Sequence, residues 1–435
     1  MTQQYFIADY GTPRDQYIKR VRVIGLFNEW TYEKLGVSEI YGGRLAILAG
    51  SNGTGKTTIL RLIRAALYRD PARQKTSVHG VSFKLFELEL FDGLIVGFER
   101  DDARTGPFTY FLKEPTGKVH QLQFRLTPTA HDHDSTAPDV DFEDDSIMSP
   151  ESPEEAAMVK ELAQLLSRYA PRLVYLPTNR EEYPVRSQPL HRNFARTTDP
   201  LQRSVNSFMS RIQVRARRES NDAEVAAFDV LSRTVEATLA GREHPASKKD
   251  LIAAFREQMQ QIEDYARIGL TRTLDANQLI SKLEAAGDEQ FGMIAEIVAP
   301  YLDSQKARLH SVRDSYGFIN QFIESMNAFF TRKTVRLNLL EGLTIYKGTE
   351  RLPLRALSSG ERQLLGIFTS ATARGPEACL VLIDEPELSL NSNWTRMLIR
   401  RLLSEALTSD TQFILATHSI ELSSQFDDAV LQLDA

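Results

Sequence analysis

Two glycines, a lysine and a threonine near the start of the chain have the types and spacing of a phosphate-binding loop. Residues 50–57 read GSNGTGKT and fit the pattern G-x-x-x-x-G-K-[ST]. Glycine lets backbone N–H groups curl around phosphate oxygens, and the N-terminus of a following helix adds the positive end of its dipole. The sequence therefore predicts a phosphate site made of Gly50, Ser51, Asn52, Gly53, Thr54, Gly55, Lys56, Thr57 and Thr58.

Lys56 and Thr57 have different expected roles in this loop. The ammonium of Lys56 is expected to reach the β- and γ-phosphates of a nucleotide, and the hydroxyl of Thr57 is expected to bind Mg²⁺. The alternative interpretation is a glycine turn without a ligand. It is disfavoured because the apolar residues 43–49 precede the loop and a helical pattern of apolar residues follows it.

Two acidic residues end a second apolar segment. Residues 379–385 read CLVLIDE, which is typical of a buried parallel strand. Asp384 is predicted to complete the Mg²⁺ shell beside Thr57, and Glu385 to polarise a water for attack on the γ-phosphate. By itself this pattern also fits a strand that enters a solvated turn. The phosphate-binding loop favours the catalytic interpretation.

A histidine ends a third apolar segment. Residues 413–419 read FILATHS, and His418 lies 34 residues after Asp384. A single histidine is often structural, but a histidine at the end of such a strand is placed to contact the γ-phosphate or the attacking water. We therefore predict a catalytic role for His418 together with Glu385 and Lys56.

The elements that must position these residues form an α/β pattern that is interrupted by a helical segment. Strands are expected at 17–27, 43–49, 172–177 and 335–354, a three- or four-stranded antiparallel sheet at 81–125, and helices at 56–68, 154–169 and across 186–330. The last 80 residues alternate between helix and strand and end in a short strand. The simplest organisation is an N-terminal part of the nucleotide-binding lobe at 1–180, a helical insertion at 181–334 and a C-terminal part of the lobe at 335–435.

Two segments of unusual charge lie inside this pattern. Residues 131–155 contain ten acidic residues and are expected to form a solvated loop; metal binding by its two histidines is the alternative. The segment from Arg186 to Arg218 contains eight arginines and one acid, Asp199. Three interpretations remain open for it: DNA binding, contact with a partner protein, and a solvated helix face.

Composition excludes several classes of protein. The 435 residues are 42% hydrophobic and 25% charged, and the net charge of −6 excludes a globally basic nucleic-acid coat protein. The single cysteine excludes an internal disulfide framework. There is no signal-peptide pattern at the N-terminus and no apolar run of about 20 residues. We expect a cytoplasmic protein without a membrane span.

Four motifs in order resemble those of the ABC-type ATPases. Besides the phosphate-binding loop, residues 357–363 (LSSGERQ) look like the family's signature, Glu385 like its catalytic glutamate and His418 like its switch histidine, with a D-loop at 387–391. The resemblance implies a mixed sheet flanked by helices, an antiparallel β subdomain, and hydrolysis of ATP with Mg²⁺. It also implies a head-to-tail homodimer or a higher homo-oligomer, in which the signature of one copy meets the nucleotide of another through Ser358, Ser359, Gly360 and Glu361.

The branch of this family is indicated by longer phrases. LPLRALSSGERQLL and LIDEPELSLN resemble the RecF, SMC and OLD-like ATPases, including the antiphage-defence ATPases of the PARIS and Septu systems. The resemblance implies a defence sensor that holds or releases an effector nuclease of Toprim or HNH type. Because the Toprim domain of OLD nucleases does not follow His418, the nuclease is expected to be a separate chain.

The Q-loop glutamine of the family has no clear counterpart. Gln121, Gln123 and Arg180 are the candidates. Three other functions stay open: a RecF-like DNA-repair ATPase that binds DNA through its arginine-rich segment, a transporter ATPase, and an ATP-binding scaffold without hydrolysis. The SSGE signature and the large insertion argue against the transporter.

Overall fold

A computed structural model describes residues 12–69, 78–102, 104–124, 152–178, 199–239, 247–272, 277–372, 379–403 and 410–433. The chain divides into two compact units. The sheet unit consists of Met1–Arg186, Pro376–Leu403 and Thr408–Ala435, and the helical unit consists of Ser187–Gly375 and Ser404–Leu407. Arg180, Arg186 and residues 131–151 of the expected acidic loop lie outside the described residues.

A five-stranded sheet forms the centre of the sheet unit. Its order is β14 (Val430–Gln432), β3 (Leu45–Ala49), β13 (Thr411–Thr417), β12 (Cys379–Asp384) and β8 (Arg172–Leu176), and all neighbours are parallel. Every residue of β3, β12 and β13 is buried. Burial therefore does not alternate along these mainly apolar strands, as expected of a parallel sheet that is covered on both faces.

A six-stranded antiparallel sheet forms the second layer of the unit. Its order is β2 (Trp30–Gly36), β1 (Ile18–Leu26), β4 (Leu85–Leu90), β5 (Ile95–Glu99), β6 (Phe108–Lys113) and β7 (Val119–Phe124). Gly93 and Gly117 adopt φ of +87° and +90° in the hairpin turns, a region that glycine enters without strain. The sequence predicted three or four strands here; the sheet has six because β1 and β2 join it.

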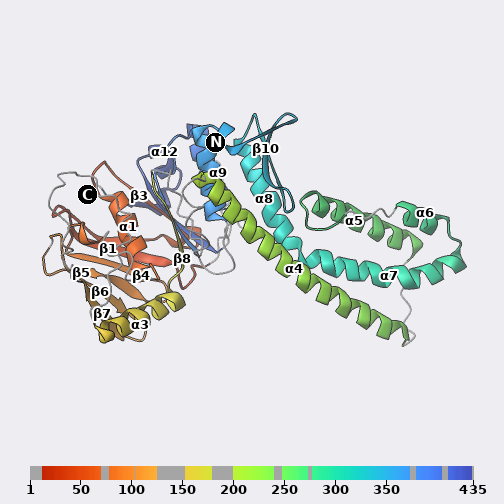
Figure 1. The fold of residues 1–435 in the computed structure, drawn as a ribbon, viewed down its shortest axis with the longest axis horizontal. Helices are drawn as coiled ribbons and strands as arrows, with labels where there is room; N and C mark the ends of the chain where they lie inside the picture. Colours follow the sequence, from red (N-terminus) through yellow and green to blue (C-terminus); the bar gives the residue numbers. More distant parts are fainter. Residues whose placement is uncertain are drawn as a thin grey trace. The chain divides into compact units, whose positions relative to one another are not determined.

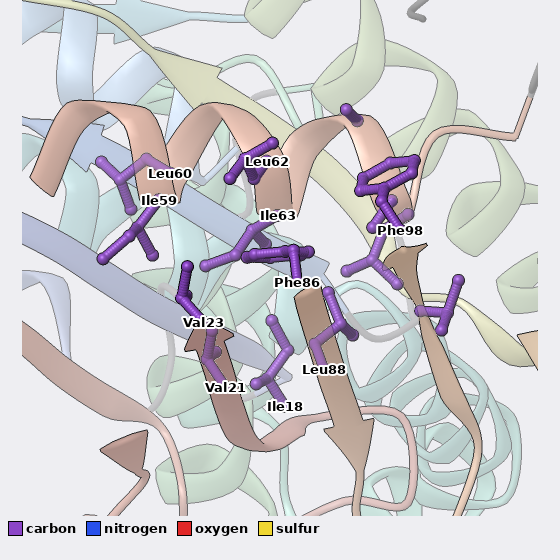
Figure 2. Packing of buried hydrophobic residues seen from close by; sticks show 14 of the residues in the cluster. Ile18, Val21, Val23, Ile59, Leu60, Leu62, Ile63, Phe86, Leu88 and Phe98 are labelled. Atoms are coloured by element: carbon purple, nitrogen blue, oxygen red, sulfur yellow. The ribbon is translucent and has the colours of Figure 1, made fainter. Parts of the chain in front are cut away.

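Helix α1 (Lys56–Ala66) packs between the two sheets of the unit. It contacts β5 of the antiparallel sheet and β12 and β13 of the parallel sheet. Figure 2 shows Ile63 of α1 close to Phe86 of β4 and Val23 of β1. All three side chains are completely buried. The helix that begins at the phosphate-binding loop is therefore packed tightly against the antiparallel sheet.

Shorter elements complete the sheet unit. They are α3 (Pro153–Tyr169), α10 (Ser392–Leu402), α12 (Ile420–Ser423), η1 (Glu39–Tyr41) and η3 (Asp427–Ala429). Helix α3 packs along β7. Residues 152–155, which were expected to end the acidic loop, form the cap and first turn of this helix: the Ser152 hydroxyl accepts a hydrogen bond from the Glu155 N–H.

The helical unit is built around one long helix (Figure 1). Helix α4 (Pro200–Leu239) has 40 residues and packs against α7 (Asp288–Ser311), α8 (Arg313–Phe329) and α9 (Ser359–Ala371). The remaining elements are α5 (Lys248–Arg267), α6 (Asn277–Ala285), β9 (Thr334–Asn338), β10 (Gly342–Lys347), β11 (Glu350–Leu352) and η2 (Leu354–Ala356). At 1.5 Å per residue, the 40 residues of α4 span about 60 Å.

The units differ from the predicted domains in the placement of residues 335–375. The prediction assigned them to the nucleotide-binding lobe, whereas they lie in the helical unit. The reason is the packing of α9 on α4: the Ser204 hydroxyl lies 2.9 Å from the hydroxyls of Thr369 and Ser370. In addition, Arg362 donates to both carboxylate oxygens of Asp199 at 2.8 Å, just before α4 begins.

No helix within the described parts of the chain is both long and apolar enough to cross a membrane.

Candidate nucleotide-binding and catalytic site

The carboxyl ends of three adjacent strands bring the predicted residues together. The phosphate-binding loop follows β3, Glu385 follows β12, and His418 follows β13, which lies between the other two. Because these strands are parallel, their carboxyl ends meet at one edge of the sheet. Residues that are more than 300 positions apart in the sequence thus form one site within the sheet unit.

The loop conformation requires glycine at a specific position. Gly53 and Gly55 adopt φ of +90° and +89°, and Gly55 caps the N-terminus of α1. A Cβ atom at Gly55 would lie 2.4 Å from Cδ2 of Leu26, whereas a Cβ atom at Gly53 would meet nothing within 4 Å. Leu26 of β1 therefore packs directly under the loop and excludes any larger residue at position 55.

Lys56 lies inside the curve of the loop. Its Nζ donates to the carbonyl oxygens of Gly50 and Ser51, at 2.7 Å in each case, and the residue is buried. The hydroxyl of Thr54 also donates to the Ser51 carbonyl at 3.0 Å. The Lys56 ammonium and the Thr54 hydroxyl thus hold two carbonyl groups of the loop from within.

Thr57 and Asp384 are in direct contact. The Thr57 hydroxyl donates to Oδ1 of Asp384 at 3.1 Å, and only 2% of Asp384 is exposed. A hydroxyl and a carboxylate are the oxygen donors that Mg²⁺ prefers, so the pair fits this ion. Mg²⁺ usually binds one or two protein oxygens and takes its other ligands from substrate phosphates and water.

Glu385 and His418 lie side by side at the same edge of the sheet. Nε2 of His418 is 3.7 Å from Oε1 of Glu385, and about a third of each side chain is exposed. Glu385 has a φ of +46°, which is uncommon for a residue with a Cβ, and its N–H donates to the carbonyl of Ala416 at 2.8 Å. The backbone strain and the accessible carboxylate are typical of a functional position.

Sequence reasoning missed Glu387 as a site residue. Its Oε1 accepts hydrogen bonds from the Thr417 hydroxyl at 2.6 Å and from the His418 N–H at 3.1 Å. Glu387 therefore ties the loop after β12 to the end of β13. The only signal in the sequence was its place in the segment compared with the family's D-loop.

Two aromatic residues beside the loop were also missed. The hydroxyl of Tyr32, a buried residue of β2, donates to the Thr54 carbonyl at 2.8 Å. A Cβ atom added at Gly55 would lie 3.4 Å from the ring of Phe27, and 41% of Phe27 is exposed. No local pattern marks either residue, because both contacts depend on how β1 and β2 fold against the loop.

The signature residues lie in the helical unit, at the N-terminus of α9. Ser358 caps the helix: its hydroxyl accepts from the Glu361 N–H at 3.3 Å, and its own N–H donates to Oε2 of Glu361 at 2.7 Å. Nζ of Lys333 donates to the same oxygen at 2.7 Å. Ser359 and Gly360 form the first turn of α9, so the four predicted residues build one capped helix start.

The charge of Glu361 is stabilised by these contacts. Burial alone raises the pKa of this carboxyl, but the hydrogen bonds from Lys333 and from the Ser358 N–H outweigh burial and lower the pKa below its ordinary value of 4.5. Glu361 is therefore an ionised partner of Lys333 at neutral pH. Gln121 and Gln123, the candidates for the Q-loop, are exposed residues of the edge strand β7.

The sequence matches a known protein family over most of its length. A family model described as "AAA domain, putative AbiEii toxin, Type IV TA system" matches residues 45–424. This range contains the phosphate-binding loop, the signature residues, Asp384, Glu385 and His418.

Two relatives are named as ATP-binding proteins. The phosphonates import ATP-binding protein PhnC of Chromohalobacter salexigens is 36% identical over 80 residues, which are 18% of this chain and 28% of PhnC. The lipoprotein-releasing system ATP-binding protein LolD of Colwellia psychrerythraea is 29% identical over 140 residues, which are 28% of this chain and 53% of LolD. The chain thus spans about half of LolD and less of PhnC.

Two solved structures show remote likeness to the chain. The SmcHead bound to the C-winged helix domain of ScpA has a TM-score of 0.38 at 11% identity, and the SMC head domain from Thermotoga maritima has a TM-score of 0.33 at 13% identity. In both cases the match covers 94% of this chain and 92% of the other chain.

Proposed function

This chain belongs to the ATPase family described as "AAA domain, putative AbiEii toxin, Type IV TA system", and we propose that it binds Mg²⁺-ATP in the sheet unit and hydrolyses it. The contact between Thr57 and Asp384, with Glu385 and His418 at the same sheet edge, is the observation that carries this proposal. A strand, a glycine loop and a helix alone would support nucleotide binding; the adjacent carboxylates support hydrolysis.

In the proposed reaction, each residue acts on a defined part of the nucleotide. The loop N–H groups and Lys56 bind the phosphates, and Phe27 offers an exposed ring beside the loop for stacking on the base. Thr57 and Asp384 would hold Mg²⁺, which would offset negative charge on the phosphates.

Glu385 and His418 are proposed to act on the water and the γ-phosphate. Glu385 accepts a proton from the water as the water oxygen attacks the γ-phosphorus. ADP leaves with the electrons of the broken P–O bond. His418 donates a hydrogen bond to the γ-phosphate from its position beside Glu385. Phosphate and ADP are the products.

The decisive experiment separates binding from turnover. Glu385→Gln is expected to bind a fluorescent ATP analogue as the unmodified protein does and to lose phosphate release by about 100-fold or more. Lys56→Ala is expected to lose both nucleotide binding and phosphate release. Glu421→Gln, which alters an exposed carboxylate on α12, serves as the matched control. Unchanged phosphate release from Glu385→Gln would refute Glu385 as the base.

We further propose that two copies close head to tail around ATP. In this arrangement the capped N-terminus of α9, with Ser358, Ser359 and Gly360, meets the γ-phosphate bound to the other copy. Glu385→Gln with ATP is expected to elute in size-exclusion chromatography as a larger species than it does without nucleotide. Adding Ser358→Arg to this variant is expected to return it to the nucleotide-free size, and an unaffected larger species would refute the role of the signature.

The biological role proposed for this ATPase is control of a separate effector nuclease in antiphage defence. Its support is the resemblance of the signature and D-loop phrases to defence ATPases. A tagged pull-down from native cells tests it: a nuclease is expected to co-purify and to be released on phage infection from the wild type but not from Glu385→Gln. Absence of a nuclease in both samples would refute this role.

A RecF-like DNA-binding ATPase is the second candidate, favoured by the exposed Arg217 and Arg218 on α4. It predicts DNA retention that weakens steeply with salt and that Arg217→Ala with Arg218→Ala abolishes.

A further inference from the structure

Helix α4 presents apolar side chains on a face without a neighbour among the described elements. Val214, Val225 and Phe228 are 47%, 65% and 69% exposed, although α4 buries its opposite face against α7 and α9. Buried alanines at positions 216 and 223 mark that opposite face. Large apolar residues gathered on one face of a helix indicate an interaction surface.

The spacing of the exposed residues is that of a helix-pairing seam. Val214, Asn221 and Phe228 follow one another at intervals of seven residues, and Val225 lies four residues after Asn221. A repeat of seven keeps one stripe of a helix facing another helix. The face that we call the α4 seam therefore consists of Val214, Arg217, Arg218, Asn221, Glu224, Val225 and Phe228.

Charge is distributed unevenly along the α4 seam. Arg217 and Arg218 lie in its first half and Glu224 in its second half, and all three are exposed. Within the described part of the chain, none of the three has an ion-pair partner, whereas the nearby Arg215 is already paired with Glu219 at 2.8 Å. The seam thus carries one positive and one negative half that are both available to another molecule.

We propose that the α4 seam pairs antiparallel with the α4 seam of a second copy of this chain. With a twofold axis at Asn221, Val214 faces Phe228 of the second copy and Arg218 faces Glu224 of the second copy. Arg217 of one copy lies over Val225 of the second copy and covers it with its methylene groups. Every position has a complementary partner at the symmetric position, as an isologous interface requires.

Self-pairing explains features that DNA binding does not. A phosphate backbone on this face would meet Glu224 and the exposed Asp222 and Asp229, which repel it, and would leave Phe228 in water. A second copy instead pairs Arg218 with Glu224 twice, once on each side of the twofold axis, and buries the apolar residues. With only three apolar side chains per copy, the pair is small compared with the roughly 1,600 Å² of a standard interface, so we expect a weak dimer.

A charge swap tests the proposed register. Arg218→Glu places Glu opposite Glu224, and Glu224→Arg places Arg opposite Arg218, so each variant alone is expected to sediment as a monomer without nucleotide. An equimolar mixture of the two variants restores both opposite-charge pairs, and it is expected to recover the dimer. Glu257→Arg, an equal change on an exposed position of α5, is the control and is expected to leave the dimer unchanged.

The readout is sedimentation velocity over a wide range of protein concentration, without ATP, so that it is separate from nucleotide-driven closure. Failure of the mixed variants to dimerise more strongly than either alone would overturn the proposal. So would a monomeric wild type whose salt-sensitive DNA retention is lost on Arg218→Glu, because the surface would then belong to DNA. The outcome of this experiment does not depend on ATP hydrolysis. It therefore neither supports nor refutes the proposed function, which is tested separately.

Discussion

At the scale of single residues, the site combines the residues of the predicted motifs with hydrogen bonds that hold its loops. Lys56 and Thr57 were predicted from a motif, and Asp384 from an acid at a strand end. The contact between Thr57 and Asp384 confirms their expected proximity. Tyr32 and Glu387 could not be predicted, because each acts across 22 or more residues on a backbone whose position depends on the fold.

Glu387 is expected to position His418 without contacting the nucleotide. Glu387→Ala removes the acceptor for the Thr417 hydroxyl and the His418 N–H, so the histidine loses its fixed position beside Glu385. We expect phosphate release to fall by about 10- to 100-fold with ATP affinity unchanged. Glu387→Gln keeps one carbonyl acceptor and should retain more activity than Glu387→Ala. Equal losses in both variants would argue against a positioning role.

Gly55 and Gly53 form a matched pair that separates strain from steric exclusion. Both have positive φ, but only Gly55 meets Leu26. Gly53→Ala should cost about 1–2 kcal/mol of strain and keep an ATP-dependent rise in melting temperature. Gly55→Ala should lose that rise, because its Cβ atom forces the loop away from Leu26. The check is differential scanning fluorimetry with and without Mg²⁺-ATP, and equal behaviour of the two variants would contradict the packing argument.

At the scale of elements, the spacing of apolar residues predicted most strands and helices, because each element has the same burial pattern along its whole length. The buried strands β3, β12 and β13 are mainly apolar, and α1 has its apolar residues at helical spacing. Strand β2 was missed since its sequence WTYEKLG contains exposed charges at the edge of the sheet. The sequence also could not show that α9 packs on α4, because that depends on contacts such as Ser204 with Thr369.

The capped start of α9 is expected to make a pH-dependent contribution to stability. The pKa of Glu361 is lowered in the folded protein, so its stabilisation is fully present above the unfolded value near 4.5 and is lost as pH falls through the lower folded value. Glu361→Gln should therefore lower the melting temperature at pH 7 and have a smaller effect as the pH approaches 3. A difference between variant and wild type that does not change over this range would contradict the ionised pairing with Lys333.

At the scale of the whole molecule, the two proposed contacts between copies use different units and respond to different conditions. Head-to-tail closure requires ATP on the sheet unit and the signature of the helical unit, whereas the α4 seam needs no ligand. A chain with two independent interfaces can assemble beyond a dimer, into a closed ring or an open chain.

This combination predicts how assembly size depends on ATP. Glu385→Gln with ATP should form species larger than two copies, because closure is retained while the α4 seam joins neighbouring dimers. Adding Arg218→Glu should stop assembly at two copies, and adding Ser358→Arg instead should leave only the weak, ATP-independent dimer. Mass photometry resolves these sizes. If one pair of copies satisfied both interfaces at once, Glu385→Gln would remain at two copies with ATP, and the two contacts would then belong to a single dimer.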